Sequence, residues 1–397
     1  MPTTATAEGH LARPLRVAMV GLRGIPATDG GVERAVEALA VELAERGHAV
    51  TVYARTAYTP DALPEYKGVR LRYLPQINTK HLEAASHTFL AVLDALRCEE
   101  FDLIHFHASG PGMFSVLPRM AGMPAVATVH GLDYRREKWG PVATGVLKLA
   151  LRLTAANADR TIVVSRALER ELRDRYGADP VYSPNGIDPA EFEQTEPVAG
   201  LEPDRFVLFL GRLVPEKGIH TLIEAYRGLD CELPLVIAGG GTHTGEYVRR
   251  LEELAARDPR VRMLGPVYGA QKAWLLNHAR LVGQPSTLEG LPIALLEASV
   301  CRRPCVVSDL PEHLEVVGDG HALTFPAGDA LALRAALRRA LDDGDGVALG
   351  EALRRRVLAR YRWDAVADTT EQVYAEILHE RRTPTRRAGR TRHASLA

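Results

Sequence analysis

The sequence predicts an α/β protein made of two doubly wound domains, each built on a parallel sheet. Its 397 residues exceed the usual size of one hydrophobic core. Short apolar, β-branched runs alternate with helical patterns in two series, as expected of strands that are buried on both faces. Between the two series, residues 178–204 are rich in Pro, Asp and Gly, which indicates a domain boundary.

The first series begins with the run LRVAMVGL at 15–22. A glycine-bearing loop follows it, and then a helical pattern from Val32 to Arg46. Further helical patterns cover 80–97 and 166–176. The remaining strands of this series are expected at 49–53, 69–74, 102–106, 124–129 and 160–164. Strands and helices that alternate in this way predict a parallel sheet with helices on both faces.

The second series predicts strands at 205–211, 234–238, 260–264, 280–283, 304–307 and 321–324. The amphipathic segment 363–380 comes after both sheets are complete, so we expect it to pack back across a neighbouring domain. The expected units are a disordered start (1–14), a first domain (15–190), a linker (191–204), a second domain (205–362), the crossing helix (363–380) and a basic, disordered tail (381–397). Two such Rossmann-like domains would face one another across a cleft, where ligands should bind.

Composition argues against several classes of protein. The formal net charge of -1 removes the electrostatic reason to expect nucleic acid as a partner. No apolar run approaches the roughly 18 residues of a spanning helix, and residues 1–14 lack the apolar core of a signal peptide. We therefore expect a cytoplasmic protein. Its cysteines suit a reducing compartment, and we expect Cys301 and Cys305 to be buried thiols rather than metal ligands.

The stretch PSTLEGLPIALLEAS, residues 285–299, is the strongest candidate for a binding site. It ends in a helical pattern whose first turn suits Pro292, because a missing N–H costs nothing there. The amides of Gly290, Leu291 and Ile293 would then be free of partners within the helix. Free amides at a helix start attract negative charge, so the sequence predicts a site for an anion.

Four charged side chains would complete this site. Glu289 precedes the helix and Glu297 lies roughly a turn and a half inside it, so they would contact different parts of an extended ligand. Arg212 and Lys217 occupy the loop GRLVPEKG between a strand and a helix. An arginine fork and a lysine point charge can grip a diphosphate together. The alternative for this pair is a solvated loop.

Glycines mark further loops at strand ends. Gly239 begins a run of three glycines after one strand of the second domain, and 261–267 supplies another loop nearby, so a nucleoside could lie over these backbones. In the first domain, GLRGIPATDGGVER does not match a dinucleotide fingerprint. Its pair Gly30–Gly31 would still let a bulky anionic ligand approach a helix start, with a simple tight turn as the alternative.

Three histidines follow strands of the first domain. His130 comes directly after the strand at 124–129, and this position favours a place in the cleft over a purely structural one. His105 is expected to point into the sheet, while His107 could face either way.

Together, GRLVPEKG, the glycine loop AGGG and PSTLEGLPIALLEAS resemble the retaining GT-B glycosyltransferases, the group related to glycogen, sucrose and mannosyl-lipid synthases, which take nucleotide sugars. The resemblance covers about residues 15–380 and implies the GT-B fold, whose closing helix, similar to 363–380, crosses back to the first domain. The loop RGIPATDGGVER is further similar to a rhamnosyltransferase-like subgroup that acts on surface polysaccharides.

The resemblance implies a role for each candidate residue. Arg212 and Lys217 would bind the diphosphate of the donor, and Glu297 its ribose. Glu289 would bind hydroxyls of the transferred sugar, which His130 would also contact. The resemblance and the glycine loops further imply amide contacts or close backbone approach to the donor at Gly30, Gly31, Gly239, Gly290 and Leu291.

The resemblance also implies retention through same-face attack, with the leaving phosphate helping to deprotonate the acceptor. Glu289 would orient the donor rather than attack it. No Asp-x-Asp stands at a strand end, so we expect the two cations, rather than a metal, to neutralise the leaving group, and no cofactor is expected. The expected function is transfer of a hexosyl or deoxyhexosyl group from a nucleotide-diphosphate sugar to a saccharide or lipid-linked acceptor, in polysaccharide or glycoconjugate synthesis.

Two other functions stay open: a sugar-nucleotide epimerase and a non-catalytic nucleotide-sugar sensor. A lipid-linked acceptor would place the protein at the inner face of the membrane, where the helix-like segment 145–157 and the basic tail could make contact. We favour the alternative, a covered helix and a solvated tail. One polar loop is likewise expected to be solvated, with contact to the acceptor as the alternative; its charged residues are Asp133, Arg135, Arg136 and Lys138.

Overall fold

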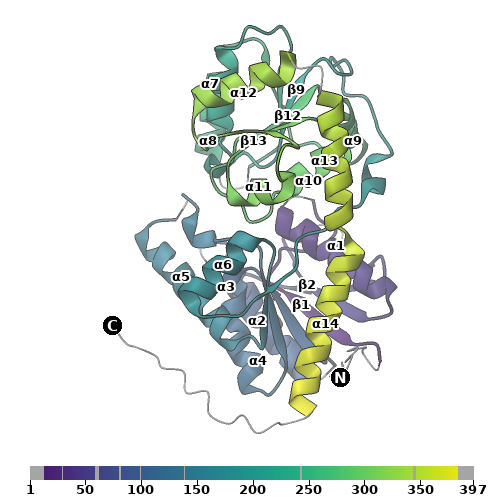
Figure 1. Cartoon of the computed structure of the whole chain (residues 1–397). Coiled ribbons are helices and arrows are strands. Elements are labelled where there is room, and N and C mark those ends of the chain that lie inside the picture. Colours follow the sequence, from purple (N-terminus) through teal and green to yellow (C-terminus); the bar gives the residue numbers. More distant parts are fainter. Residues whose placement is uncertain are drawn as a thin grey trace, which may run out of the picture.

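The computed structural model describes residues 13–28, 30–58, 62–79, 82–98, 100–137, 139–241, 244–342 and 346–382. These residues form two α/β domains, which lie one above the other in Figure 1. Most of the expected disordered start, most of the expected tail and Lys138 lie outside the described residues.

The first domain is built on an eight-stranded sheet that is parallel except at β3, which runs antiparallel to β4. Across the sheet, the strands are β3 (Glu65–Tyr66), β4 (Val69–Leu74), β2 (Ala49–Arg55), β1 (Arg16–Val20), β5 (Leu103–His107), β6 (Ala125–Val129), β7 (Arg160–Val163) and β8 (Val181–Tyr182). All six expected strands are confirmed. The short β3 and β8 were not predicted, and β8 pairs with β7 inside the stretch that sequence alone assigned to a domain boundary.

Helices cover both faces of this sheet, which explains its continuous apolar strands. In β1, Val17 and Met19 face α1 (Gly31–Glu45) and α14 (Trp363–Arg382), while Ala18 and Val20 face α2 (Glu83–Cys98). The other helices of this domain are α3 (Ser109–Gly112), α4 (Val116–Met120), α5 (Pro141–Asn157) and α6 (Arg166–Tyr176).

The second domain has a six-stranded parallel sheet, and each of its strands was predicted. Across the sheet, the strands are β11 (Val261–Gly265), β10 (Leu235–Ala238), β9 (Val207–Leu210), β12 (Leu281–Gln284), β13 (Cys305–Ser308) and β14 (Leu323–Phe325). One face packs against α7 (Ile219–Arg227), α8 (Gly245–Ala255) and α12 (Ala330–Asp342). The other packs against α9 (Gly269–His278), α10 (Ile293–Val300) and α13 (Gly346–Arg360), and α11 (Pro311–Val317) lies near the domain interface (Figure 1).

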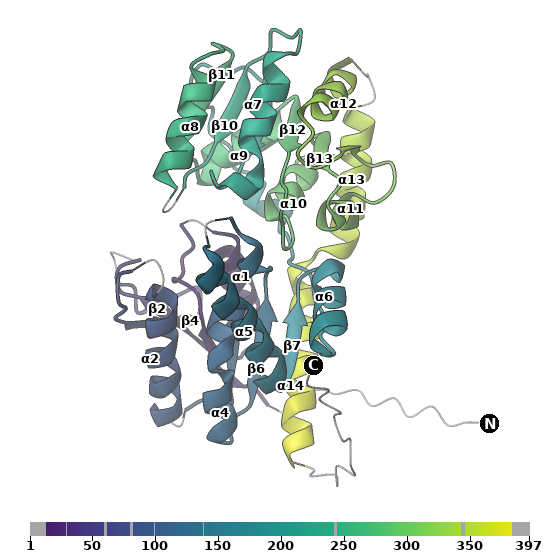
Figure 2. The ribbon, with the colours of Figure 1, turned by 90° about the vertical axis from the view of Figure 1, so that its left-hand side faces the viewer.

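Strand order places one ligand-binding edge in each domain. In the first sheet β1 lies between β2 and β5, and in the second β9 lies between β10 and β12. At such a reversal of strand order, the loops that leave neighbouring strands diverge, and ligands of doubly wound domains bind there. The two sets of loops face one another where the domains meet (Figure 2).

The chain crosses between the domains twice at one place, where the amide of Ile187 donates to the carbonyl oxygen of Tyr361 at 2.9 Å. The segment expected as a linker, 191–204, already lies against the second domain, since Asn277 Nδ2 donates to the carbonyl of Phe192 at 2.8 Å. After the second crossing, α14 runs back along the first domain, as predicted, and extends to Arg382.

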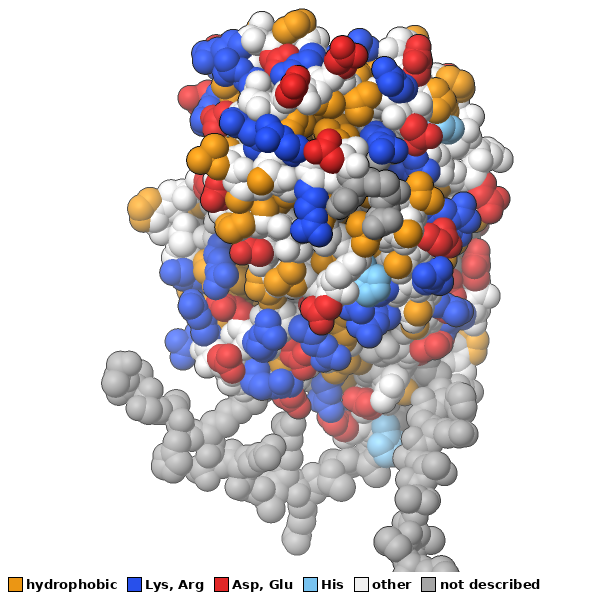
Figure 3. All heavy atoms as spheres, turned by 45° about the horizontal axis from the view of Figure 1, so that its top comes forward, with side chains coloured by type: hydrophobic (Ala, Val, Ile, Leu, Met, Phe, Trp, Pro, Cys, Tyr) orange, Lys and Arg blue, Asp and Glu red, His pale blue; other side chains and the backbone are white. Residues whose placement is uncertain are grey.

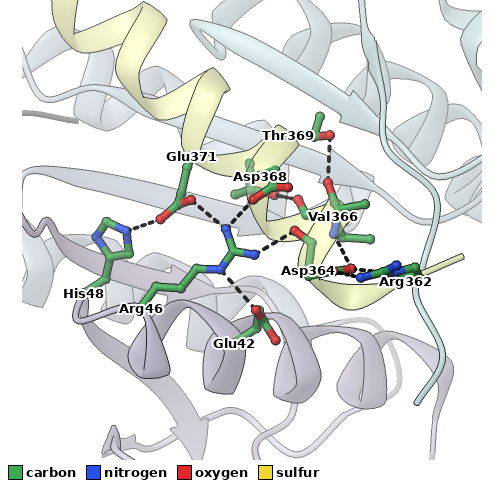
Figure 4. Close-up of polar contacts among 11 residues, drawn as sticks. Glu42, Arg46, His48, Arg362, Asp364, Val366, Asp368, Thr369 and Glu371 are labelled. Atoms are coloured by element: carbon green, nitrogen blue, oxygen red, sulfur yellow. Dashed lines mark hydrogen bonds and ion pairs between the residues drawn. The ribbon is translucent and has the colours of Figure 1, made fainter. Parts of the chain in front are cut away.

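Arg46, at the end of α1, fixes α14 to the first domain (Figure 4). Its Nη1 lies 2.6 Å from Asp368 Oδ1 and 2.8 Å from Glu371 Oε2. Its Nη2 donates to the carbonyl of Asp364 at 2.8 Å, and His48 Nε2 lies 2.7 Å from Glu371 Oε1. The crossing helix is therefore held by polar contacts as well as by apolar packing.

The surface carries charges of both signs. On the face shown in Figure 3, Lys and Arg side chains are interspersed with Asp and Glu, as suits a chain with a formal net charge of -1. None of the helices in the described part of the chain combines the length and the apolar content needed to cross a membrane.

Candidate functional site

Two loops of the second domain meet at the edge where its strand order reverses. The loop after β9 contains the short helix η4 (Pro215–Lys217) and ends at Gly218, whose φ is 66°. A Cβ atom on Gly218 would lie 2.1 Å from the carbonyl oxygen of Pro285, in the loop after β12. Only glycine permits this conformation and this close approach, which sets Lys217 beside Glu289.

Glu289 is bound through one of its two oxygens. Its Oε1 lies 2.6 Å from Lys217 Nζ, accepts from Ser286 Oγ at 2.6 Å, and lies 3.9 Å from His313 Nε2. Burial raises the pKa of Glu289, but these neighbours, Lys217 first, bring it below its ordinary value. The carboxylate is therefore ionised near neutral pH, and among the described residues nothing donates to its Oε2.

His313 and Ser286 were not predicted from sequence. His313 is fully buried, and burial lowers its pKa. Its Nδ1 lies 3.0 Å from Ser308 Oγ, and that hydroxyl donates to the carbonyl of Ser286 at 2.6 Å. The two serines and His313 thus brace the loop that carries Glu289. In the sequence, His313 lies in the segment PEHLE, which matches no motif that would have identified it as a site residue.

Arg212 follows β9 and is half-buried. Burial lowers the pKa of its guanidinium, and the charge of Arg136 from the first domain lowers it further. Within the described part of the chain, no carboxylate lies at ion-pair distance from Arg212. A half-buried arginine without a carboxylate partner is suited to bind an anionic ligand.

Glu297 is also bound through one oxygen. Its Oε1 lies 2.6 Å from Lys272 Nζ, on α9, and 2.8 Å from Arg34 Nη1, which comes from α1 of the other domain. Glu297 and Lys272 are both buried, and burial lowers the pKa of Lys272 while Glu297 opposes this shift. Neither Lys272 nor Arg34 was predicted, because Lys272 lies on the helix before α10 and Arg34 on a helix of the other domain, and neither belongs to the motif that contains Glu297.

The start of α10 differs by one residue from the prediction. Pro292 caps the helix with a non-helical ψ of 90°, and the helix begins at Ile293 rather than including the proline in its first turn. Leu291 is buried. A Cβ atom on Gly290 would lie 1.8 Å from the carbonyl oxygen of His130, so this loop touches the first domain.

The other predicted glycines lie at close backbone approaches. A Cβ atom on Gly239 would lie 1.8 Å from the carbonyl oxygen of Gly211, so Gly239 lets two loops of the second sheet pack together. Gly30 caps α1 with a φ of 99°. Gly31 opens that helix, and a Cβ atom there would lie 3.5 Å from Ile293 Cδ1, across the domain interface.

The three histidines form a row that ends at the domain interface. His105 is buried in the sheet as predicted, with Nδ1 2.7 Å from the hydroxyl of Tyr374 and Nε2 2.7 Å from Thr128 Oγ1. His107 is buried as well, and its Nδ1 lies 3.3 Å from His130 Nε2. Burial lowers the pKa of His130 to about 4, so this side chain is neutral near pH 7.

The polar loop after His130 is tied down by ion pairs. Arg136 Nη2 lies 3.0 Å from Asp133 Oδ1, and Arg135 Nη2 lies 3.1 Å from Glu171 Oε2.

The cysteines Cys301 and Cys305 are buried free thiols, as expected from the sequence. Burial raises the pKa of each thiol to about 12.

Comparisons with known proteins agree with this architecture. The family profile described as Glycosyltransferase Family 4 matches residues 29–191, and that described as Glycosyl transferases group 1 matches residues 191–357. Among solved structures, the sucrose-phosphate synthase from Thermosynechococcus elongatus has a TM-score of 0.80 and 24% identity, covering 92% of this chain and 99% of that one. The Anabaena protein HepE in complex with UDP and glucose has a TM-score of 0.76 and 20% identity, covering 91% and 100%.

Relatives of known activity cover almost the whole chain. The D-inositol 3-phosphate glycosyltransferase of Stackebrandtia nassauensis is 28% identical over 421 residues, covering 94% of each chain. The phosphatidyl-myo-inositol mannosyltransferase of Mycolicibacterium smegmatis is 30% identical over 361 residues, covering 88% of this chain and 90% of that protein. With this similarity and two facing parallel-sheet domains, the chain belongs to the group 1 glycosyltransferases and has the GT-B fold.

Proposed function

We propose that this glycosyltransferase moves a hexosyl or deoxyhexosyl group from a nucleotide-diphosphate sugar to a saccharide or lipid-linked acceptor, with retention at the anomeric carbon. One observation carries the proposal. Glu289 and Glu297 flank the start of α10, and each has Oε1 bound by cations while Oε2 accepts nothing from the described residues. Two such carboxylates suit the hydroxyl groups at the two ends of a nucleotide sugar. The neighbour HepE is known in complexes with UDP, glucose and UDP-glucose, which supports this class of donor.

The donor would lie along the second domain. Glu297 would accept from the ribose hydroxyls, and Arg212 and Lys217 would bind the diphosphate. Glu289 would accept from hydroxyls of the transferred sugar. Gly239 would lie under the nucleoside, and the loop amides of Gly290 and Leu291 would contact sugar and phosphate, while the first domain would contribute His130, Gly30 and Gly31.

In the chemical step, the bond between the anomeric carbon and the phosphate oxygen breaks, and its electron pair leaves with the diphosphate. The acceptor oxygen bonds to the same face of the carbon, and its proton passes to the leaving phosphate. Positive charge develops on the sugar and negative charge on the diphosphate. Arg212 and Lys217 would stabilise the diphosphate without a metal, and Glu289 would orient the sugar.

A lipid-linked acceptor would bring the protein to the inner face of the membrane. The N-terminal half of α5 supports this proposal, because Val142, Val146 and Leu149 are exposed on it. The covered helix that the sequence favoured is therefore wrong for this half of α5. Lys148 and Arg152, on the same helix, are exposed as well. An apolar helix face flanked by cations suits an anionic lipid surface.

A panel of nucleotide sugars tests the function. We expect slow release of nucleotide from one donor, faster release with acceptor, and no loss of rate when EDTA is added. The Glu289→Ala and Lys217→Ala variants should release no nucleotide, while Arg70→Ala, which removes a largely exposed arginine, should match wild type. The anomeric configuration of the product, read by NMR, tests retention.

Other outcomes identify the rivals. A converted sugar that is still attached to its nucleotide would identify an epimerase, and binding without turnover would identify a sensor. Full activity in Glu289→Ala or Lys217→Ala would contradict the site assignment.

A further inference from the structure

The helices α1 and α10 approach each other across the domain interface through two matched pairs of residues. The first pair is Gly31 and Ile293, since a Cβ atom on Gly31 would lie 3.5 Å from Ile293 Cδ1. The second pair is Arg34 and Glu297, with Arg34 Nη1 2.8 Å from Glu297 Oε1. Because residues three and four apart lie on one face of a helix, the first contact brings the second into register.

The second domain does not need Arg34 to neutralise Glu297. Lys272 Nζ already lies 2.6 Å from the same oxygen, and its side chain is as buried as that of Glu297. Arg34 adds a second cation to this carboxylate, from the opposite domain and with its side chain more exposed. Because Lys272 already balances the charge of Glu297, we take the contribution of Arg34 to be the position of the carboxylate.

Both cations bind Oε1, and this leaves Oε2 with a defined direction. Within the described part of the chain no group donates to Oε2. The atom is nevertheless not fully enclosed by protein, because part of its surface stays accessible. It therefore borders space that a ligand hydroxyl can reach. With two donors on its other oxygen, the carboxylate is oriented before a ligand arrives, and such preorganisation lowers the cost of binding.

We infer that Arg34 is a positioning residue for the ribose of the donor, an inference that rests on the proposed function. It holds Glu297 so that Oε2 meets the ribose hydroxyls, and it does so only while the two domains are together. Affinity for the ribose therefore depends on a residue of the domain that lies opposite the nucleotide. The diphosphate contacts of Arg212 and Lys217 do not depend on Arg34.

The test compares nucleotides with and without ribose hydroxyls. Isothermal titration calorimetry is done with UDP, GDP, ADP and dTDP, each alongside its 2′,3′-dideoxy counterpart; dTDP, a deoxyribonucleotide, loses only a 3′-hydroxyl in this comparison. Because a hydrogen bond to a charged group is being weakened, Arg34→Ala should bind the preferred nucleotide about tenfold more weakly than wild type. Its affinity for the matching analogue should equal that of wild type. Arg34→Lys should recover part of the loss, and Arg70→Ala is the control.

A mutant cycle separates positioning from a general role in holding the domains together. If Arg34 acts through Glu297, the double variant Arg34→Ala/Glu297→Ala should bind no more weakly than Glu297→Ala alone. Equal weakening of nucleotide and analogue by Arg34→Ala would overturn the inference, as would wild-type affinity for both. A wild-type protein that binds none of the four nucleotides would overturn the proposed function as well, so the two failures are distinguishable.

Discussion

The α-carbon of Gly290 lies against the main-chain carbonyl of His130, at a point where the two domains touch. A Cβ atom at this position would lie 1.8 Å from that oxygen and 3.2 Å from the α-carbon of Gly131. No rotation of a side chain relieves a clash between two backbones. The loop that carries Glu289 therefore keeps its place only if residue 290 has no side chain.

We predict that Gly290→Ala lowers the rate of nucleotide release by at least about tenfold, since displacement of a positioned carboxylate by about 1 Å can cost more than that. The measurement is a nucleotide-release assay under saturating donor. Gly145→Ala is the matched control, because a Cβ atom there meets nothing within 4 Å. That control should keep wild-type activity and melt slightly higher, as expected when alanine replaces glycine within a helix. Wild-type activity in Gly290→Ala would contradict the close contact.

The pair Lys217 and Glu289 predicts a pH effect on stability. Burial favours the neutral form of Glu289, and Lys217 reverses this, so the pKa of Glu289 lies below 4.5 in the folded protein. The stability that the carboxylate contributes is thus present above pH 4.5 and is lost as the pH falls through the folded pKa. In Lys217→Met, the largest effect that opposes burial is lost, so the folded pKa of Glu289 rises relative to that in wild type. The charged carboxylate then contributes less stability than in wild type, and the difference between variant and wild type narrows as the pH falls.

We therefore expect Lys217→Met to be less stable than wild type by about 3 kcal/mol at pH 7, with a smaller difference at about pH 4. Thermal melts followed by circular dichroism at a series of pH values provide the measurement. Lys148→Met, at an exposed position of α5, should show a small difference that does not vary with pH. A constant, large deficit in Lys217→Met would contradict the assigned pKa direction.

The contacts of Arg46 with α14 predict a salt-sensitive loss of stability. Arg46→Ala removes ion pairs to Asp368 and Glu371 and a hydrogen bond to the carbonyl of Asp364. We expect a loss of about 1–3 kcal/mol in the free energy of unfolding, because Arg46 and Glu371 are largely buried although Asp368 is exposed. The gap to wild type should narrow at about 1 M salt, which screens the wild-type pairs. Urea denaturation measures both values, and identical curves for Arg46→Ala and wild type would refute the role of this contact.

The exposed face of α5 predicts binding to anionic vesicles. Val146 is 54% exposed, and Val146→Asp should weaken cosedimentation with phosphatidylglycerol vesicles roughly tenfold, since it removes an apolar contact and adds a like charge. Val347, which is 76% exposed on α13, supplies the control Val347→Asp. Equal losses in both variants, or a wild-type protein that stays in the supernatant, would remove α5 from the proposal.

Most of the fold follows from sequence patterning. Strands buried on both faces leave continuous apolar runs, and all twelve strands predicted from such runs are present. The two-residue strands β3 and β8 are too short to show a hydrophobic pattern in the sequence. They form because each pairs with a longer neighbouring strand, β4 and β7 respectively. The start of α10 was placed one residue early, because proline tolerates the cap position as well as the first turn.

The site was predicted less completely than the fold. Short sequence motifs at the ends of predicted strands identified Glu289 and Lys217. The two residues lie on two loops at one edge of the sheet, and the structure brings them together. Arg34 and Lys272 could not be found in this way, because each lies on a helix outside these motifs and reaches Glu297 only when its helix packs beside α10. His107 was left ambiguous for the same reason, since its partner His130 follows the neighbouring strand β6.

The helix α14 has a consequence for synthesis of the chain. The core of the first domain contains side chains from this helix, among them Val373, Tyr374 and Ile377. The hydroxyl of Tyr374 also meets His105 inside the sheet. On the ribosome, the second domain can therefore fold while the first still lacks part of its interior, which exposes apolar surface until the last helix emerges. The domain that is made first is thus the last to be completed.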